Sequence, residues 1–178
     1  MIIKKNGSEL TDSELAQIND ALLREFKVSL PSRDQLKDRL FFLLKQGNTI
    51  LAMGALLEVR PVIFDEKEYV IYGFVNVVAN EKGKGYGKQV ITAMKEYLTT
   101  YDKTGLGFCM LNNKRFYEKC GFNIETTSTQ RFVYTKGAER ITNQDGQIIF
   151  YQDSSDNFMK KVLAKPEKEV SIPTQNLW

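Results

Sequence analysis

The fold is decided by the stretch Val75-Asn76-Val77-Val78-Ala79-Asn80-Glu81-Lys82-Gly83-Lys84-Gly85-Tyr86-Gly87-Lys88, which passes from an apolar strand through a glycine-rich turn. An amphipathic helix follows, with its apolar stripe at Val90, Ile91, Met94, Leu98 and Tyr101. Amide N–H groups at the start of a helix have no acceptor within it, and the helix dipole adds partial positive charge there. Glycines let the backbone approach a ligand closely. This order of elements therefore predicts a phosphate-binding site.

The glycine spacing differs from that of the two commonest nucleotide-binding motifs. A P-loop needs G-x-x-x-x-G-K-[ST], but Gly83 and Gly87 are one residue too close, and Gln89 stands where Ser or Thr is required. The glycines run G-x-G-x-G, so the dinucleotide fingerprint G-x-G-x-x-G is absent as well. The alternative interpretation is a flexible turn with solvated lysines.

Together with its neighbours, the segment resembles the coenzyme A motif of the GNAT superfamily of N-acetyltransferases, an apolar strand and short turn followed by [QR]-x-x-G-x-[GA]. Lys82, Gly85 and Gly87 occupy the three defined places, and the lysine departs from Gln or Arg. The resemblance implies acetyl-CoA as co-substrate. It implies that backbone amides hold the pyrophosphate at Gly83, Lys84, Gly85, Tyr86, Gly87 and Lys88. It further implies a bulged, splayed strand that pairs with the pantetheine arm at Val75, Asn76 and Val77.

The second stretch that is similar to the family is Asn113-Lys114-Arg115-Phe116-Tyr117-Glu118-Lys119-Cys120-Gly121-Phe122, against A-x-x-[LF]-Y-E-x-x-G-[FW]. In the family this tyrosine lies near the thioester sulfur and protonates the departing thiolate, and Tyr117 stands at its position. Such an acid is useful because attack by an amine develops negative charge first on oxygen and then on sulfur. The alternative is that Tyr117 merely packs one edge of a helix. The resemblance also implies, slightly out of register, that Asn112 contacts the pantetheine arm.

The sequence leaves the general base unassigned. Many relatives carry a glutamate on the strand before the loop, but the strand from Tyr69 to Val78 contains no carboxylate. The alternatives are Glu58, Glu68 and the C-terminal carboxylate of Trp178, although the sequence favours an ordinary solvated group at each position.

The composition excludes several classes of protein. With no histidine among 178 residues, Ser-His-Asp and Cys-His hydrolases are excluded, and we expect no metal site. Cys109 and Cys120 are interpreted as reduced packing residues, since no histidine is present to activate them. The net charge of +3 is too small, and too evenly interleaved, to predict nucleic-acid binding. No apolar run approaches the roughly 20 residues that span a bilayer. We therefore expect a cytoplasmic protein that binds neither nucleic acid nor a membrane.

The rest of the chain predicts a mixed α/β (α+β) fold. Helices begin after two capping boxes, one with Thr11 and Glu14 and one with Ser32 and Gln35. Strands are predicted at 1–6, 40–44, 49–64, 69–78, 106–111, 131–135 and 147–151, the last two paired with each other. We predict a GNAT-like splayed mixed sheet of six or seven strands with helices on both faces. From the resemblance we expect residues 1–152 to form the acetyl-CoA-dependent N-acetyltransferase domain, and residues 153–178 to form a tail that either covers the acceptor cleft or stays disordered.

The implied activity is the transfer of an acetyl group from acetyl-CoA to a primary amine by direct attack in a ternary complex. A small-molecule amine is favoured over a protein as acceptor, and the strand at 50–64, the segment 106–109 and the final tryptophan are loosely similar to aminoglycoside 2′-N-acetyltransferases. The alternative is a non-catalytic acetyl-CoA-binding sensor or scaffold, which the missing strand carboxylate favours. We expect a monomer or a homodimer.

Overall fold

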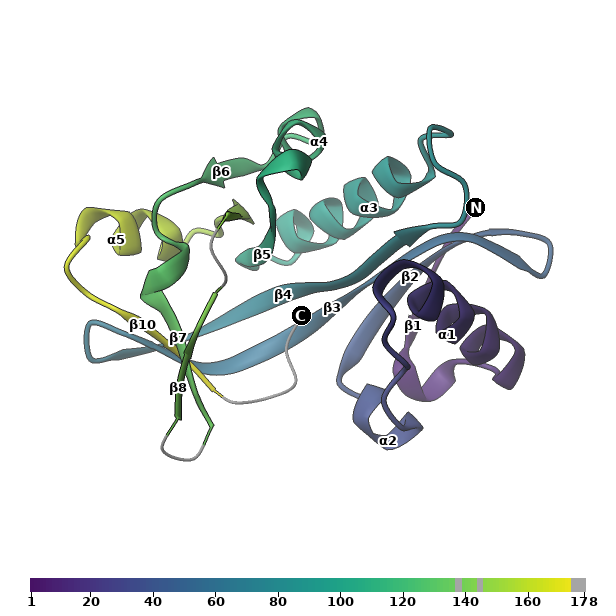
Figure 1. The fold of residues 1–178 in the computed structure, drawn as a ribbon, viewed down its shortest axis with the longest axis horizontal. Helices are drawn as coiled ribbons and strands as arrows, with labels where there is room; N and C mark the ends of the chain where they lie inside the picture. Colours follow the sequence, from purple (N-terminus) through teal and green to yellow (C-terminus); the bar gives the residue numbers. More distant parts are fainter. Residues whose placement is uncertain (137–138, 144–145, 174–178) are drawn as a thin grey trace. The chain divides into compact units, whose positions relative to one another are not determined.

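The computed structural model describes residues 1–136, 139–143 and 146–173 (Figure 1). The chain divides into two compact units. Unit 1 comprises Met1–Leu57 and Phe74–Glu96, and unit 2 comprises Glu58–Gly73 and Tyr97–Trp178. Three elements contribute residues to both units: β3 (Thr49–Phe64), β4 (Lys67–Ala79) and α3 (Tyr86–Thr100). None of the helices in the described ranges combines the length and the apolar character needed to cross a lipid bilayer.

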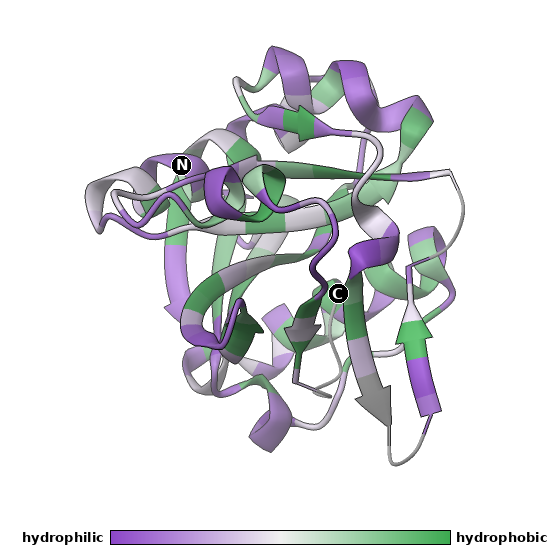
Figure 2. Ribbon diagram, turned by 90° about the vertical axis from the view of Figure 1, so that its left-hand side faces the viewer, coloured by the Kyte–Doolittle hydropathy of each residue, from purple (hydrophilic) through white to green (hydrophobic). Residues whose placement is uncertain are grey.

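Unit 1 is built on an antiparallel sheet in which β2 pairs with β1 on one side and with β3 on the other. The predicted strand at 40–44 is confirmed as part of β2, where Phe41, Phe42 and Leu43 are fully buried. Figure 2 shows that several strands of the chain consist largely of hydrophobic residues, whereas hydrophilic residues are frequent in the turns and helices. The other elements of this unit are β1 (Ile2–Asn6), the 3-10 helix η1 (Gly7–Glu9), α1 (Asp12–Phe26), α2 (Arg33–Leu36) and β2 (Arg39–Gln46).

Helix α1 begins at the capping box that the sequence predicts. Thr11 Oγ1 accepts a hydrogen bond from the Glu14 N–H at 3.2 Å, and Glu14 Oε2 accepts one from the Thr11 N–H at 2.9 Å. The same carboxylate is buried and pairs with Lys5 and Lys45, each at 2.8 Å. Glu14, which the sequence predicts only as a capping residue, therefore also links α1 to β1 and β2 through ion pairs.

The two faces of the unit 1 sheet carry different helices, because neighbouring strand residues point to opposite sides. A Cβ atom added at Gly54 would lie 2.9 Å from a side chain of α3, so α3 covers the face that Gly54 shares with its β2 partner Phe42. Helix α1 lies on the other face, because Glu14 contacts Lys5, whose β2 partner is Phe41. Helices on both faces of the sheet are thus confirmed.

Unit 2 is a mixed sheet with short helices. β4 pairs in parallel with β5, β9 lies antiparallel between β5 and β6, and β10 runs antiparallel to β3 and parallel to β7. These pairings confirm the predicted mixed sheet. The elements that complete this unit are β5 (Gly105–Met110), η2 (Leu111–Asn113), α4 (Lys114–Lys119), β6 (Asn123–Glu125), η3 (Thr129–Arg131), β7 (Phe132–Lys136), β8 (Glu139–Thr142), β9 (Gln147–Gln152), α5 (Phe158–Ala164) and β10 (Val170–Ile172).

Two details of the predicted sheet are wrong. The described residues contain ten strands rather than six or seven, because the three-residue strands β6 and β10 and the four-residue strand β8 carry too few residues for a periodic pattern. The predicted pairing between 131–135 and 147–151 is also absent: β7 pairs with β8 and β10, whereas β9 pairs with β5 and β6. β8, which is closer to β7 in the sequence than β9 is, pairs with β7 as a hairpin. β9 instead lies between β5 and β6.

The segment after residue 152 contains regular structure, α5 and β10, as far as Ile172. Asp153 accepts hydrogen bonds from the N–H groups of Met159 and Lys160 at 2.9 and 3.1 Å, at the start of α5. Phe158 is fully buried in this helix and packs edge-on against Phe64, with ring centroids 6.4 Å apart. Polar composition alone favoured disorder for this segment, but its few apolar residues are the ones that pack.

Candidate functional site

The glycine-rich loop of unit 1 begins at a firmly held residue, Asn80. The N–H of Asn80 donates to the carbonyl of Leu51 at 2.9 Å, and its side-chain amide donates to the carbonyl of Ile50 at 2.5 Å. Arg24 of α1 donates to the Asn80 side-chain oxygen at 2.5 Å. These contacts with β3 and α1 fix the point at which the chain leaves β4.

Beyond this anchor, Gly83 and Gly85 adopt the left-handed conformation, with φ of +80° and +74°. Glycine adopts this conformation at little cost in free energy, because it has no Cβ atom to clash with the backbone. A Cβ atom at either position would meet nothing within 4 Å, so the loop has room on its outer side. The left-handed glycines are therefore required by the path of the backbone and not by close packing.

Helix α3 begins directly after the loop and leaves its first amides without helical acceptors. The first i to i+4 hydrogen bond runs from the Gln89 N–H to the Gly85 carbonyl at 3.1 Å. The N–H groups of Tyr86, Gly87 and Lys88 precede it in the helix. Together with the helix dipole, these donors form a site that attracts an anion.

The three lysines of this segment differ in their surroundings. Lys82 forms an ion pair with Glu25 of α1 at 2.6 Å, so its charge is partly neutralised within unit 1. Lys84 and Lys88 are exposed and make no ion pair with any residue in the described ranges. The mobile positive charge that the sequence places around the loop therefore comes mainly from Lys84 and Lys88.

The strand that leads to the loop is irregular at the predicted position. Asn76, in the middle of β4, has φ of +57°, a left-handed conformation that interrupts the extended strand. Val75 is buried and Val77 is half-buried. The ladder between β4 and β5 consists of the pairs Tyr72–Gly105 and Gly73–Leu106. Asn76 thus marks an interruption where the resemblance to the GNAT superfamily places a bulge.

Tyr117 lies in unit 2, on the short helix α4, and belongs to an aromatic cluster. Its ring stacks on Phe150 of β9, with centroids 3.6 Å and planes 13° apart. Phe116 and Phe122 meet the same ring edge-on at 5.1 and 6.2 Å. This packing fixes the ring plane and therefore the direction of the hydroxyl group.

Burial raises the pKa of Tyr117 well above that of a solvated phenol, and the neighbouring Cys109 and Cys120 thiols act in the same direction. The hydroxyl group therefore keeps its proton at neutral pH. Burial also raises the pKa of Cys109 to about 12, so this thiol is not an activated nucleophile. Both cysteines are half-buried, as expected of packing residues.

Asn112 lies in the 3-10 helix η2 and is exposed. Around it, Met110, Leu111 and Phe116 expose 46, 55 and 37% of their surface. The predicted site residues are therefore divided between the units. Those of β4 and the loop belong to unit 1, whereas Asn112 and Tyr117 belong to unit 2.

The three alternatives for a general base have different surroundings. Glu58 accepts a hydrogen bond from the Tyr72 hydroxyl at 2.7 Å and pairs with Arg60 at 3.0 Å, so both of its oxygens have partners. Burial and this carboxylate raise the pKa of Tyr72. Glu68 is exposed at the start of β4. Trp178 lies outside the described residues.

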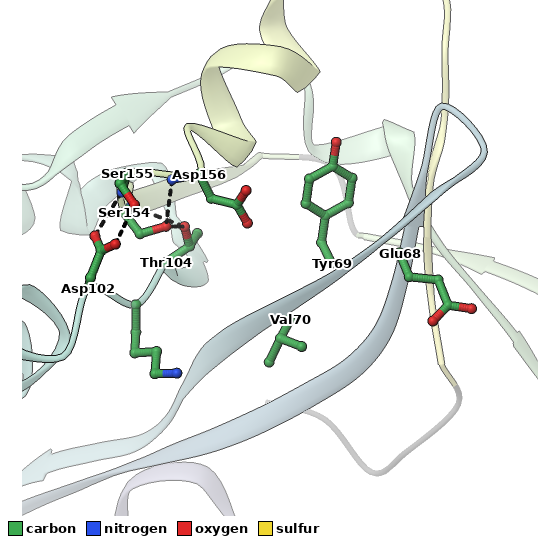
Figure 3. A pocket seen from close by; sticks show the side chains of 9 residues that line it. Glu68, Tyr69, Val70, Asp102, Thr104, Ser154, Ser155 and Asp156 are labelled. Atoms are coloured by element: carbon green, nitrogen blue, oxygen red, sulfur yellow. Dashed lines mark hydrogen bonds between the residues drawn. The ribbon is translucent and has the colours of Figure 1, made fainter.

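Unit 2 also contains a polar cavity of about 510 Å³ that the sequence did not indicate (Figure 3). The carboxylate of Asp102 accepts hydrogen bonds from the N–H and hydroxyl groups of Ser155. The hydroxyl groups of Thr104 and Ser154 lie 2.9 Å apart. These four side chains are hydrogen-bonded among themselves, and charged residues such as Glu68 and Lys103 complete the lining. Such contacts join residues about 50 positions apart, a pairing that no local pattern reveals.

The chain was compared with known families, sequences and structures. Residues 9–122 match the family model described as Acetyltransferase (GNAT) family. No curated protein sequence matches significantly. The solved structure of the GNAT family N-acetyltransferase YhbS from Escherichia coli, in complex with CoA, is similar at 12% identity and a TM-score of 0.61, over 98% of this chain and 89% of that one.

Two further solved structures are similar over nearly their whole length. Escherichia coli ElaA shows 19% identity and a TM-score of 0.59 over 86% of this chain and 99% of its own. An acetyltransferase from Bacillus subtilis, in complex with CoA, shows 21% identity and a TM-score of 0.54 over 85% and 97%. At identities this low, the similarity to the solved structures shows only a shared fold. The evidence for a family relationship is the match to the family model.

Proposed function

Because the chain belongs to the GNAT acetyltransferase family, we propose that it transfers an acetyl group from acetyl-CoA to the primary amine of a small molecule. The observation that carries the proposal is the loop at the start of α3. It combines two left-handed glycines, three amides without helical acceptors and two unpaired lysines, all within the matched region. This set of donors fits a diphosphate.

The residues of unit 1 hold the coenzyme part of this substrate. Backbone amides from Gly83 to Lys88 bind the pyrophosphate, and Lys84 and Lys88 add charge at its rim. The backbone around Asn76 binds the pantetheine arm in the manner of an added strand, because the left-handed residue interrupts the regular strand there. Asn112 of unit 2 donates an additional hydrogen bond to that arm.

Tyr117 provides the acid in the chemical step. The neutral amine of the acceptor attacks the thioester carbonyl carbon, the carbon–sulfur bond breaks, and the leaving thiolate takes the proton of the Tyr117 hydroxyl. The amine loses one proton to solvent or to a base that we do not assign, and the Tyr117 phenolate takes up a proton from solvent before the next turnover. Because burial holds the pKa of Tyr117 high, the hydroxyl group stays protonated, and activity is not expected to fall through its ionisation in mildly alkaline solution.

The proposal is tested by measuring thiol release from acetyl-CoA with a panel of amines, polyamines, aminoglycosides and amino acids. Amine-dependent release supports an acetyltransferase. Saturable binding of acetyl-CoA without release from any amine would instead identify a sensor or scaffold. No binding at all would contradict both functions.

The role of Tyr117 is tested by Tyr117→Phe, which keeps the ring stacked on Phe150 and removes only the hydroxyl group. We expect kcat to fall about 100-fold, as for loss of a general acid, with an unchanged Kd for acetyl-CoA. The matched control is Tyr151→Phe, a half-buried tyrosine of β9 whose pKa is also raised by burial. Equal activities of the two variants would rule out the acid role.

A further inference from the structure

The polar cavity of unit 2 lies beside an unpaired edge of β4. The Tyr72 N–H group donates to the Thr104 carbonyl at 2.8 Å, so the backbone of Tyr72 faces β5. Every second residue of a strand presents its N–H and C=O groups to the same edge, so Val70 faces this edge as well. The chain turns at Asp102, with φ of 48°, and β5 begins only at Gly105. No backbone group in the described ranges therefore pairs with Val70 at this edge.

The wall of the cavity carries more negative than positive charge. Three carboxylates line it, those of Glu68, Asp102 and Asp156, together with one cation, Lys103. The Lys103 ammonium lies 5.9 Å from the centroid of the Tyr72 ring, which is not part of the lining. A cleft lined mainly by one sign of charge attracts ligands of the opposite sign. The charges of the wall therefore favour a cationic ligand.

The three carboxylates keep acceptor capacity for such a ligand. Asp102 accepts hydrogen bonds from the neutral N–H and hydroxyl groups of Ser155, and these bonds lower its pKa, so it is ionised at neutral pH. Asp156 and Lys161 form an ion pair at 3.5 Å, but both side chains are about half exposed, and exposed pairs contribute little. Glu68 is exposed, and its side chain makes no ion pair or hydrogen bond within the described ranges.

The hydroxyl group of Tyr69 also lacks a partner among the described residues. The side chain is only 8% exposed, and its ring packs against Phe158 with centroids 5.0 Å apart. Its oxygen is not among the completely buried unpartnered atoms, so a ligand can reach it from the cavity that Tyr69 lines. In Figure 3 the Asp156 carboxylate points towards this side chain. Leaving a hydroxyl unpaired at a nearly buried position costs free energy, which a hydrogen bond to a ligand would recover.

The spread of these groups indicates an extended organic cation. The carboxylates come from three segments: the start of β4, the turn after α3 and the stretch before α5. No set of three or more potential metal ligands lies close together in the part of the chain that the structure describes. The cavity volume of about 510 Å³ lies in the range of small-molecule sites. A ligand with ammonium groups at both ends of an aliphatic chain can reach carboxylates on different walls, and each ammonium offers three donors.

We propose that this cavity binds a small aliphatic diamine or polyamine in its protonated form. The residues that line the cavity belong neither to the loop at 83–88 nor to the interruption at Asn76 nor to α4. The site therefore uses none of the residues assigned to acetyl transfer, and the inference goes beyond that function. It predicts binding in the absence of acetyl-CoA, and its failure would leave the proposed function untouched.

The first test titrates the isotopically labelled chain, without acetyl-CoA, with three ligands of equal chain length: 1,4-diaminobutane, butylamine and 1,4-butanediol. We expect saturable shifts of the Val70, Thr104 and Ser155 amide resonances with the diamine. Its Kd should lie about 5-fold below that of butylamine, because the second ammonium adds an ion pair, and should rise with salt concentration. The diol should not bind. Equal Kd values for the diamine and the monoamine, or shifts only at other residues, would overturn the inference.

The second test compares Glu68→Gln and Asp156→Asn with Glu96→Gln. Glu96 is an exposed residue of α3 that does not line the cavity, so its loss controls for the change in net charge. We expect each cavity variant to weaken the Kd of 1,4-diaminobutane about 3- to 5-fold and Glu96→Gln to leave it unchanged. All three side chains are exposed, so the variants should fold. The same Kd in the natural chain and in both cavity variants would place the diamine elsewhere and overturn the inference.

Tyr69→Phe separates a role in binding from a role in folding. The variant keeps the ring against Phe158 and removes only the hydroxyl group. We expect the Kd of 1,4-diaminobutane to weaken about 3- to 10-fold, as for loss of one hydrogen bond, with an unchanged midpoint of thermal unfolding. An unchanged Kd would remove this hydroxyl from the site, whatever the midpoint.

Discussion

Replacing Gly85 by alanine tests whether the backbone of the loop binds the coenzyme. At φ of +74° an alanine costs about 1–2 kcal/mol, because its Cβ atom crowds its own backbone. The added Cβ atom meets nothing within 4 Å, so no packing holds the strained conformation in place. The loop can relax, and binding must then restore its shape. The same 1–2 kcal/mol should therefore appear as a Kd for acetyl-CoA weakened about 5- to 30-fold.

The matched control is Gly47→Ala in the turn between β2 and β3. Gly47 also has a positive φ, +57°, and its added Cβ atom also meets nothing within 4 Å. Because paired strands hold this turn on both sides, we expect a loss of about 1 kcal/mol in the free energy of unfolding and no change in Kd. Calorimetric titration with acetyl-CoA and urea denaturation measure the two quantities. Equal Kd values for the natural chain and Gly85→Ala, or an equal weakening by Gly47→Ala, would refute the reasoning.

Two further predictions concern stability. Burial raises the pKa of Glu14, but hydrogen bonds from Lys45, Lys5 and the Thr11 N–H group together outweigh it and lower the pKa to about 2. Since the folded pKa lies below the unfolded value of 4.5, this group stabilises the fold above that pH and loses its effect as pH falls towards 2. Glu14→Gln should therefore cost about 2–3 kcal/mol at pH 7 and much less near pH 3 in urea denaturation; a cost independent of pH would contradict this. A Cβ atom at Gly107 would lie 2.2 Å from the Phe150 ring, so Gly107→Ala should destabilise the chain by about 1–3 kcal/mol. An unchanged midpoint of thermal unfolding would show that the ring moves aside freely.

The features that the sequence predicted are those determined by neighbouring residues. The capping box at Thr11 is formed by groups three residues apart, and the loop from Gly83 to Gly85 follows from backbone conformations that glycine favours. The continuous apolar run at 40–44 likewise predicted β2 as a buried strand. In each case the cause lies within a few residues of its effect.

The features that the sequence did not predict depend on distant partners. β9 pairs with β5, with Met110 opposite Gln147 and Gly105 opposite Gln152, so the apolar residues of β9 could not reveal a partner so distant in the chain. The stacking of Tyr117 on Phe150 has the same origin. Arg39 looks like an ordinary polar residue at the start of a strand, and only the fold shows that it is buried without a counter-charge.

The central claim is that backbone amides at the start of α3 bind the coenzyme diphosphate. It is tested most directly by following the amide resonances of an isotopically labelled chain during titration with acetyl-CoA. We predict saturable shifts for Gly83, Gly85 and Gly87 that are larger than that of Gly47, with the same midpoint as the calorimetric curve. Saturation of the protein with acetyl-CoA while these three resonances stay in place would contradict the claim.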